Sequence, residues 1–447
     1  MRNPLRASFV RDVALTGGTQ AIQAVCAMVG GILVARYLGT EDKGELSVLV
    51  ALGTLSVLLA SFGVHQSAIY FMGRHKAERD SVVANNLTFA VAGGAITALV
   101  LAGAVLAFRR QLLHEIPIGL FLLYLGGVPF LYFNEFARRI GLGAGRVGIY
   151  NVPDLITGAG LLFGTAAAIA AFGDDLVPLV VLRAAAEVVV TVVLFLLLRR
   201  VVRLRIRPSR EVLRRQLGYG VKNYAASLMW LFLLQSDLIL CNAFLGNGET
   251  GVYSVAVSLG IPVTILAGVV GTLTFQRVSS DESRPSRIAN TNRVLRLLLP
   301  LVAVPVVVLG ASAGWLVPFV YGEDFAGGGA ALRLLLPGLL ALTLELVVMN
   351  FLAGEGSPSI VWRAPVVGLF VNVAANLWAI PQFGIDGAAA TSSVAYTLVF
   401  VLVMRHYLAS TGSSLRDALV LRGADVRALL GRGRAPGQGA PAGAGAA

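Results

Sequence analysis

The sequence predicts an all-α integral membrane protein in which twelve transmembrane helices form two similar six-helix halves. Two observations carry this prediction. First, 56% of the 447 residues are hydrophobic and 13% are charged, and apolar stretches of about 20 residues, long enough to cross a bilayer as a helix, recur along the chain. Second, two sets of residues recur in the same order in both halves, which indicates an internal duplication.

The repeat begins with a Leu-Gly pair. In the first set, each residue has a match 207 residues later: Leu38, Gly39, Gly44, Ser47 and Val48 match Leu245, Gly246, Gly251, Ser254 and Val255. Its second set lies 211 residues apart and pairs Gly143, Gly145, Ile149, Phe172 and Gly173 with Gly354, Gly356, Ile360, Phe383 and Gly384. Because the two sets are collinear, duplication explains them better than chance. Duplicated membrane halves that face each other across a central space are typical of transporters.

Six spans are predicted in each half, and the first helix is interpreted as uncleaved because it is too polar for a signal peptide. In the first half the spans are Val13–Ala35, Leu46–Met72, Val82–Phe108, Ile116–Ala137, Ile149–Phe172 and Leu176–Leu198. In the second half they are Leu217–Phe244, Val252–Phe275, Val294–Val317, Gly328–Leu352, Ile360–Ile380 and Gly387–Met404. The expected units are an N-terminal lobe (1–198), a basic linker (199–216), a C-terminal lobe (217–408) and a largely disordered cytoplasmic tail (409–447).

Lysine and arginine determine the predicted orientation. With both termini in the cytoplasm, cytoplasmic segments hold 30 of the 36 basic residues, and the outer segments hold four: Arg36, Lys43, Arg109 and Arg110. This asymmetry is the positive-inside pattern of multi-pass proteins. The eight arginines from Arg199 to Arg215 are interpreted as topological, with contact to anionic lipid headgroups. Nothing that accompanies them indicates a nucleic-acid partner.

Motifs of enzymes and metalloproteins are missing from the sequence. There is no phosphate-binding loop followed by Lys-Ser/Thr and no His-Glu-x-x-His zinc motif. Cys26 and Cys241 lie inside predicted spans without metal-ligand spacing, and His65 is interpreted as a packed helix residue. The outer loops are too short for a catalytic domain. We therefore expect no enzyme activity, no cofactor and no metal site, and transport driven by an ion gradient or by the gradient of the substrate.

Five ionisable residues lie deep inside predicted spans: Asp154, Arg183, Glu187, Asp237 and Glu345. Each costs about 2.5 to 3.5 kcal/mol at mid-membrane, so they are expected to face a polar space rather than lipid. Arg183 and Glu187 share a helix face, and two interpretations stay open: a mutually neutralising pair, or a role in the cavity. Asp237 is the first candidate for a proton- or cation-responsive group, with Glu187 and Glu345 as further candidates.

Four basic residues are the candidate substrate contacts: Arg36, Arg183, Arg333 and Lys222. Three of them have a simpler alternative. Arg36 stands near two acids, Glu41 and Asp42, and a local salt bridge would explain it. Arg333 lies near the outer end of its span and Lys222 near the inner end, so both side chains could snorkel to the interface.

Two glutamates occupy quasi-equivalent positions in the halves. Glu135 stands eight residues before Gly143, and Glu345 stands nine residues before Gly354. Arg138 lies one turn after Glu135, so a pair on the same helix is the simple explanation for the first of them.

Three segments carry a resemblance to a known family. They are Ala35–Gly39 with Gly44, Asp237 with Leu245, Gly246 and Gly251–Ser254, and Pro381–Ala389. In order and spacing they resemble the bacterial polysaccharide-biosynthesis flippases, the oligosaccharide exporters of the multidrug/oligosaccharidyl-lipid/polysaccharide superfamily. The resemblance covers nearly all of the first 408 residues and marks Arg36 and Asp237 as matching positions. It implies a MATE-like fold with two six-helix lobes around a V-shaped cavity, working by alternating access.

The function that this resemblance implies is a flippase for a lipid-linked oligosaccharide on undecaprenyl pyrophosphate, located in the bacterial inner membrane. The implied partners are this substrate, membrane lipids, a proton or sodium ion, and a glycan polymerase or glycosyltransferases. A cationic, hydrated cavity would suit pyrophosphate, because guanidinium matches phosphate geometry. Three alternatives stay open: a cation-coupled multidrug antiporter of the same superfamily, a peptidoglycan lipid-precursor flippase, and a non-transporting scaffold.

Overall fold

The fold is that of a computed structural model, which describes residues 4–74, 78–107, 117–203, 208–278, 283–355, 358–423 and 425. Side chains are described in these ranges except at 4–14, 74, 104–105, 222–223, 225–226, 265–278 and 358. Arg109, Arg110 and the side chain of Lys222 therefore lie outside the described residues. The described part of the chain is helical and contains no β-strand.

Helices account for nearly all of this part. They are α1 (Pro4–Ser61), α2 (Val64–Arg74), α3 (Arg79–Ala107), α5 (Ile118–Gly143), α6 (Val147–Ala159), α7 (Thr165–Phe172), α8 (Leu176–Leu198), α9 (Arg210–Val278), α10 (Arg284–Tyr321), α11 (Gly328–Gly354), α12 (Pro358–Thr411) and α13 (Leu415–Leu419). A π-helical turn, Gly160–Gly164, joins α6 to α7, and a 3₁₀ turn, Glu323–Phe325, precedes α11. The predicted span Ile149–Phe172 is thus one helix with a wider turn in its middle.

Three long helices each contain one non-helical glycine. α1 bends at Gly39 (φ 83°, ψ −171°), α9 at Gly246 (φ 84°, ψ −176°) and α12 at Gly384 (φ 59°, ψ −142°). Glycine adopts a positive φ at no steric cost, which explains its use here. Gly39 and Gly246 are matched residues of the repeat, so the duplicated motif has one backbone conformation in both halves. Gly173, the counterpart of Gly384, is similar (φ 74°, ψ −131°).

Nine helices of the described residues are long and apolar enough to cross a membrane. The three kinked helices contain candidate spans of 47, 38 and 53 residues, about twice the roughly 20 residues that one crossing needs. The protein is therefore a multi-pass membrane protein, and the count of twelve crossings stays a prediction.

One predicted span is interrupted in the structure. The sequence predicts a continuous helix over Leu46–Met72, whereas α1 ends at Ser61 and α2 begins at Val64. Between them, Phe62 (φ 45°) and Gly63 (φ 70°) are both left-handed. A right-handed helix cannot continue through two such residues, and the conformation is unfavourable for phenylalanine. We call these two residues the α1–α2 break.

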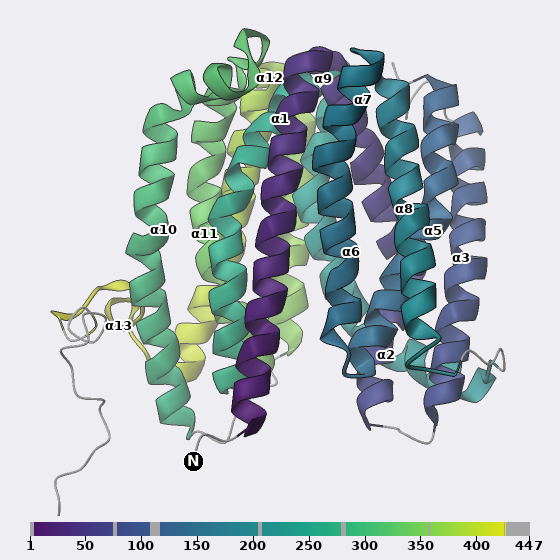
Figure 1. The fold of residues 1–447 in the computed structure, drawn as a ribbon. Helices are drawn as coiled ribbons and strands as arrows, with labels where there is room; N and C mark the ends of the chain where they lie inside the picture. The colour runs from purple at the N-terminus through teal and green to yellow at the C-terminus, as the bar shows by residue number, and fades with distance from the viewer. Residues whose placement is uncertain are drawn as a thin grey trace, which may run out of the picture.

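Figure 1 shows α3, α5, α6 and α8 on one side and α10, α11 and α12 on the other, with α1 and α9 between them. We call the end of the bundle where α1 starts the N-terminal end, and the end that carries Gly39 the kink end. Near the kink end, Gly44 lies against the backbone of Gly251, and near the N-terminal end, Gly63 lies against that of Gly220. α1 and α9 are therefore in close backbone contact near both ends of the bundle.

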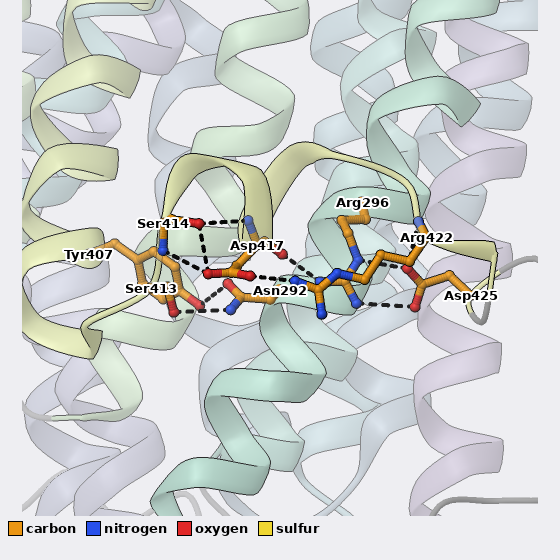
Figure 2. Close-up of polar contacts among 8 residues, drawn as sticks. All are labelled: Asn292, Arg296, Tyr407, Ser413, Ser414, Asp417, Arg422 and Asp425. Carbon is orange, nitrogen blue, oxygen red and sulfur yellow. Dashed lines mark hydrogen bonds and ion pairs between the residues drawn. The ribbon is translucent and has the colours of Figure 1, made fainter.

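The first part of the predicted tail packs against the bundle. α12 continues to Thr411, and residues 412–423 together with Asp425, which we call the strap, lie against α10 (Figure 2). Nε of Arg296 on α10 donates to Asp425 at 2.6 Å, and a second guanidinium nitrogen donates at 3.1 Å. Ser414 and Asp417 form a capping box at the start of α13. Residues 426–447 of the predicted tail lie outside the described residues.

Candidate functional site between the two halves

A cavity of about 260 Å³ lies between the halves, on the kink-end side of the contact between Gly63 and Gly220. α1, the π-helical turn and its flanking helices, α8 and α9 line it. Its polar lining residues are Lys43, Ser47, Thr157, Thr165, Arg183, Glu187, Gln235, Ser254 and Ser258. A polar cavity between duplicated membrane halves is the usual place for the substrate of a transporter.

Two cations line this cavity. Lys43 on α1 is buried, and its Nζ atom lies beside Gly31 on the other arm of α1, where a Cβ atom would make an ordinary contact at 3.7 Å. Arg183 comes from α8 and is half-buried. The ion pairs found among the described residues include neither side chain. Both charges therefore face the cavity without a carboxylate in contact.

Glu187 also lines the cavity, but its carboxylate is bound by the N-terminal half. Nδ2 of Asn134 on α5 donates to Glu187 Oε2 at 2.8 Å, and the Thr191 hydroxyl donates to Asn134 Oδ1 at 2.8 Å. Within the described structure, no ion pair joins Glu187 to Arg183, although one helical turn separates them. The described lining of the cavity thus has two cations for one carboxylate, and that carboxylate already accepts a hydrogen bond.

The remaining predicted substrate contacts lie elsewhere. Nε of Arg36 donates to the backbone oxygen of Val320 at 2.7 Å, and its guanidinium also donates to that of Phe319. Arg333 is exposed, and its Nε donates to the backbone oxygen of Gly310 at 3.0 Å. The structure therefore places Arg183 alone of these predicted cations in the cavity, as far as the described side chains extend.

Lys43 was not predicted as a site residue. Its position just after Gly39 suggested an outer loop, whereas the helix resumes directly after the kink and turns Lys43 inward. A signal was present in the sequence. Lys43 stands inside the repeated motif, directly before Gly44, where the other half has Thr250. A charged residue present in only one copy of a duplicated motif indicates a function specific to that half.

The N-terminal half also contains a buried charge cluster on α5 and α6. Glu135 forms ion pairs with Arg138 (3.4 Å) and Arg139 (3.6 Å), which confirms the predicted pairing on one helix. Arg138 also contacts Asp154 at 3.1 Å, and its guanidinium lies 4.3 Å from the centre of the Tyr150 ring. The opposite charges in this cluster partner each other, so we interpret it as structural.

Asp237 lies in a polar network inside the C-terminal half. Its Oδ2 atom accepts from the Tyr253 hydroxyl at 2.6 Å and from the Ser392 hydroxyl at 2.9 Å. Asn372 on α12 donates to Ser392 at 3.1 Å and accepts from Asn376 at 3.1 Å. Both side-chain donors are neutral, so they do not compensate the negative charge of an ionised Asp237. One turn of α9 carries both this network and the cavity-lining residue Gln235.

Glu345 differs from Asp237 in its surroundings. It is fully buried on α11, and neither carboxylate oxygen has a hydrogen-bond partner among the described residues. An unpartnered buried carboxyl group is costly and is neutral or functional in most proteins that keep one.

Within the described residues, no three His, Cys, Asp or Glu side chains are placed to hold a metal ion together. His65, predicted as a packed residue, is buried with its ring centre 5.5 Å from that of Phe136.

Comparison with known families assigns this architecture. A profile described as "Polysaccharide biosynthesis protein" matches residues 9–275, which is more than half of the chain. The chain belongs to this family. The matched region contains the whole cavity and both glycine contacts between the halves.

Curated relatives agree with membership of the polysaccharide biosynthesis family. The chain is 26% identical to "Probable flippase AglR" of Haloferax volcanii over 186 residues, which are 40% of this chain and 38% of that protein. It is 21% identical to "Putative O-antigen transporter" of Shigella flexneri over 400 residues, which are 87% of this chain and 94% of that protein. The chain thus spans about two-fifths of the length of the archaeal relative.

Solved structures of two transporter types have the same fold. "Lipid II flippase MurJ, inward closed conformation" has a TM-score of 0.72 at 14% identity, covering 90% of this chain and 88% of that one. An inward-facing multidrug resistance MATE family transporter of the MOP superfamily has a TM-score of 0.69 at 15% identity, covering 87% and 94%. The expected MATE-like fold is confirmed for this member of the family.

Proposed function

We propose that this family member is a flippase that moves a lipid-linked oligosaccharide, carried on undecaprenyl pyrophosphate, from the inner to the outer leaflet by alternating access. The observation that carries the proposal is the pair of cations, Lys43 and Arg183, in the cavity between the halves. Pyrophosphate is a compact polyanion, and guanidinium and ammonium groups are its usual protein partners. The lipid tail would stay in the bilayer while the head group occupies the cavity.

The supporting geometry is the charge balance of the cavity. Glu187, the one carboxylate among the described lining residues, already accepts a hydrogen bond from Asn134, so the two cations can each offer donors to a phosphate. In a site shielded from bulk water, such charge-assisted hydrogen bonds are about twice as strong as neutral ones. The sugar part would contact the neutral side of the cavity, which α9 supplies through Gln235, Ser254 and Ser258.

The first prediction concerns these two cations. Arg183→Gln and Lys43→Gln each remove charge-assisted hydrogen bonds of about 1.5 to 3 kcal/mol, so we expect each variant to flip substrate about tenfold more slowly or worse. The measurement uses purified protein in vesicles with a fluorescent undecaprenyl-pyrophosphate oligosaccharide. Arg363→Gln, at an exposed arginine of α12, is the matched control. Flipping at the control rate by both variants would reject the anion site.

Arg36, Arg333 and Lys222 remain proposed substrate contacts for other stages of transport. Their Gln variants belong in the same assay. Arg333 is exposed and binds a backbone oxygen of α10 within its own half in this structure, so its contact with substrate is proposed for another stage.

For ion coupling, we propose Asp237 as the first group, with Glu187 and Glu345 as further candidates. Two neutral hydroxyl groups, those of Tyr253 and Ser392, bind the Asp237 carboxylate, and a carboxylate among neutral oxygens suits a proton or a sodium ion. The vesicle assay identifies the ion when a proton gradient and a sodium gradient are imposed separately.

A second candidate function is a cation-coupled multidrug antiporter or a peptidoglycan lipid-precursor flippase. The fold shared with transporters of both kinds favours it. Competition in the vesicle assay by a cationic drug or by a peptidoglycan lipid precursor distinguishes these functions from glycan export. A non-transporting scaffold would flip none of them.

We further propose twelve crossings, with each kinked helix crossing twice, and the N-terminal end of the bundle facing the cytoplasm of a bacterial inner membrane. The basic residues concentrated at that end support this orientation. Glycosyltransferases or a glycan polymerase would then act before and after the flippase. No enzyme activity is expected of the chain itself.

A further inference from the structure

Among the described residues, close backbone contacts of glycines join the two halves near each end of the second arm of α1. Near the kink end, a Cβ atom on Gly44 would lie 1.8 Å from the backbone oxygen of Asn247, and one on Gly251 would lie 1.9 Å from that of Thr40. Gly44 and Gly251 are matched residues of the repeat, so this contact relates the halves by their internal symmetry. Arg36 ties the same end together, because it donates to the last turn of α10, where helix carbonyls lack partners of their own.

The second contact lies at the N-terminal end and has a different construction. A Cβ atom on Gly63 would lie 2.5 Å from the backbone oxygen of Gly220, and one on Gly220 would lie 2.6 Å from that of Gly63. These two residues are not matched in the repeat. About 28 Å separates Gly63 from Gly44 along the chain at the rise of a helix, and the cavity-lining residues of this arm after Gly44 lie between them: Leu46, Ser47, Val50 and Ala51.

The α1–α2 break frees the carbonyl groups that hold this second contact. A left-handed residue ends the helical hydrogen bonds, so the last carbonyls of α1 need other donors. The Tyr132 hydroxyl, from the same half, donates to Ala60 at 2.5 Å. The Tyr224 hydroxyl, from α9 of the other half, donates to Leu59 at 2.6 Å. One freed carbonyl therefore links the two halves directly.

Side chains on α2 add further links to the same stretch of α9. The Gln66 amide donates to the Ser227 hydroxyl at 3.2 Å, and the Gln216 amide donates to the Ser67 hydroxyl at 3.2 Å. The rings of Tyr70 and Tyr219 stack with centres 4.4 Å apart. Each link is polar or aromatic and at the end of the bundle, so water can replace it when the halves separate.

We propose that the α1–α2 break, with Gly220 and Tyr224 of α9, is the gate that closes the cavity toward the N-terminal end, and that the contact of Gly44 with Gly251 is the opposite gate. The inference rests on the proposed transport function. The structure is then the state with both gates shut. Opening the first gate releases Leu59 from Tyr224 and lets Phe62 leave its unfavourable left-handed conformation, so the break acts as a hinge.

The test compares two neighbouring glycines on α9. A methyl group at Gly220 clashes with Gly63, whereas a Cβ atom on Gly218 meets nothing within 4 Å. Gly220→Ala should therefore prevent closure, and Gly218→Ala should not. The readout is the rate at which a membrane-impermeant thiosulfonate labels a cysteine placed in the cavity (Ser258→Cys), in a protein with Cys26→Ala and Cys241→Ala. Spheroplasts and inverted vesicles expose the two membrane faces separately.

We expect Gly220→Ala to raise labelling from the N-terminal face about tenfold and to leave labelling from the kink face unchanged. Tyr224→Phe, which removes one hydrogen bond of about 1 kcal/mol, should raise it about fivefold. Tyr407→Phe, which removes a buried hydroxyl bond to Asn292 far from the contact, is its control. Equal labelling of Gly220→Ala and Gly218→Ala, or a rise from both faces, overturns the proposal.

A cross-link supplies the converse arm. Gln66→Cys with Ser227→Cys, bridged by a short bifunctional thiosulfonate, should abolish labelling from the N-terminal face, and persistent labelling contradicts the gate. These measurements need no substrate. If the labelling changes as expected but the protein moves no lipid-linked oligosaccharide, the proposed flippase function is refuted and the gates stand. If the protein flips the oligosaccharide but the variants leave the labelling unaltered, the gates are refuted and the flippase function stands.

Discussion

Single buried carboxyl groups in this molecule have very different surroundings. Glu135 and Glu345 occupy quasi-equivalent positions in the two halves, yet Glu135 contacts two arginines. Glu345 is fully buried and has no hydrogen-bond partner among the described residues. The quasi-equivalent position therefore holds a carboxyl group that has charged partners in one half and, as far as the described residues extend, none in the other. A structural ion pair explains Glu135 but not Glu345, and this difference supports the coupling role proposed for Glu345.

Replacing these two glutamates with leucine should change the free energy of unfolding in opposite directions. Glu345→Leu removes an unpartnered polar group and should raise the free energy of unfolding by about 1 to 3 kcal/mol. Glu135→Leu leaves the half-buried Arg139 without its carboxylate, while Arg138 keeps Asp154, and should lower the free energy of unfolding by about 1 to 3 kcal/mol. Thermal melting of the purified variants in detergent measures both. A destabilised Glu345→Leu protein would show that the carboxyl group has a partner in the folded state.

Among the elements, the strap has a titratable attachment. Asp425 is buried against α10, and the Arg296 guanidinium that donates to it lowers the pKa of its carboxyl group. Because the folded pKa is below the unfolded value, ionised Asp425 stabilises the strap at neutral pH. This contribution is present above the unfolded pKa of about 4. It is lost as the pH falls through the folded pKa.

We therefore expect Asp425→Asn to loosen the strap at neutral pH. Loss of charge-assisted hydrogen bonds of about 1.5 to 3 kcal/mol should speed amide hydrogen exchange in residues 413–423 about tenfold or more. The wild-type protein should reach the same loosened state only below about pH 4, and the variant should show no such transition. Asp324→Asn, at an exposed aspartate beyond α10, should match the wild type. A pH-dependent step in Asp425→Asn would assign the titration to another group.

The helices were the most predictable elements. Apolar length and the repeat predicted the all-helical membrane fold, and the matched glycines Gly39 and Gly246 have the same φ and ψ. The α1–α2 break was not predicted, because Phe62 gives no sequence signal for a left-handed conformation. Tertiary contacts hold it there: hydroxyl groups of Tyr132 and Tyr224, distant in sequence, bind the carbonyls that the break frees.

For the whole molecule, the site was only partly predictable for a similar reason. Arg183 was identified because a charge inside an apolar span needs an explanation. Lys43 was missed, because whether a residue beside a kink points into the cavity depends on the direction of the helix after the kink. Arg36 matches a family position, yet in this structure it binds α10 of the other half. Motifs therefore indicated which residues matter, and the packing of the halves decided how they are used.

The internal symmetry of the molecule leads to a last prediction, at the kink end. A Cβ atom added to Gly44 or to Gly251 would lie less than 2 Å from a backbone oxygen of the opposite half. Gly44→Ala and Gly251→Ala should therefore prevent the same closure to the same extent. Each should raise labelling of the cysteine at Ser258→Cys from the kink face about tenfold, by analogy with the other gate, without raising it from the N-terminal face.

The control for this contact is Gly248→Ala, since a Cβ atom on Gly248 would lie at an ordinary 3.7 Å from the Thr40 hydroxyl. Combining Gly44→Ala with Gly251→Ala should add little to either change alone, because both substitutions disrupt one shared contact and contacting residues are not additive. Additive effects of the pair, or an effect of only one of them, would mean that the two glycines belong to separate contacts and that symmetry does not govern this end of the molecule.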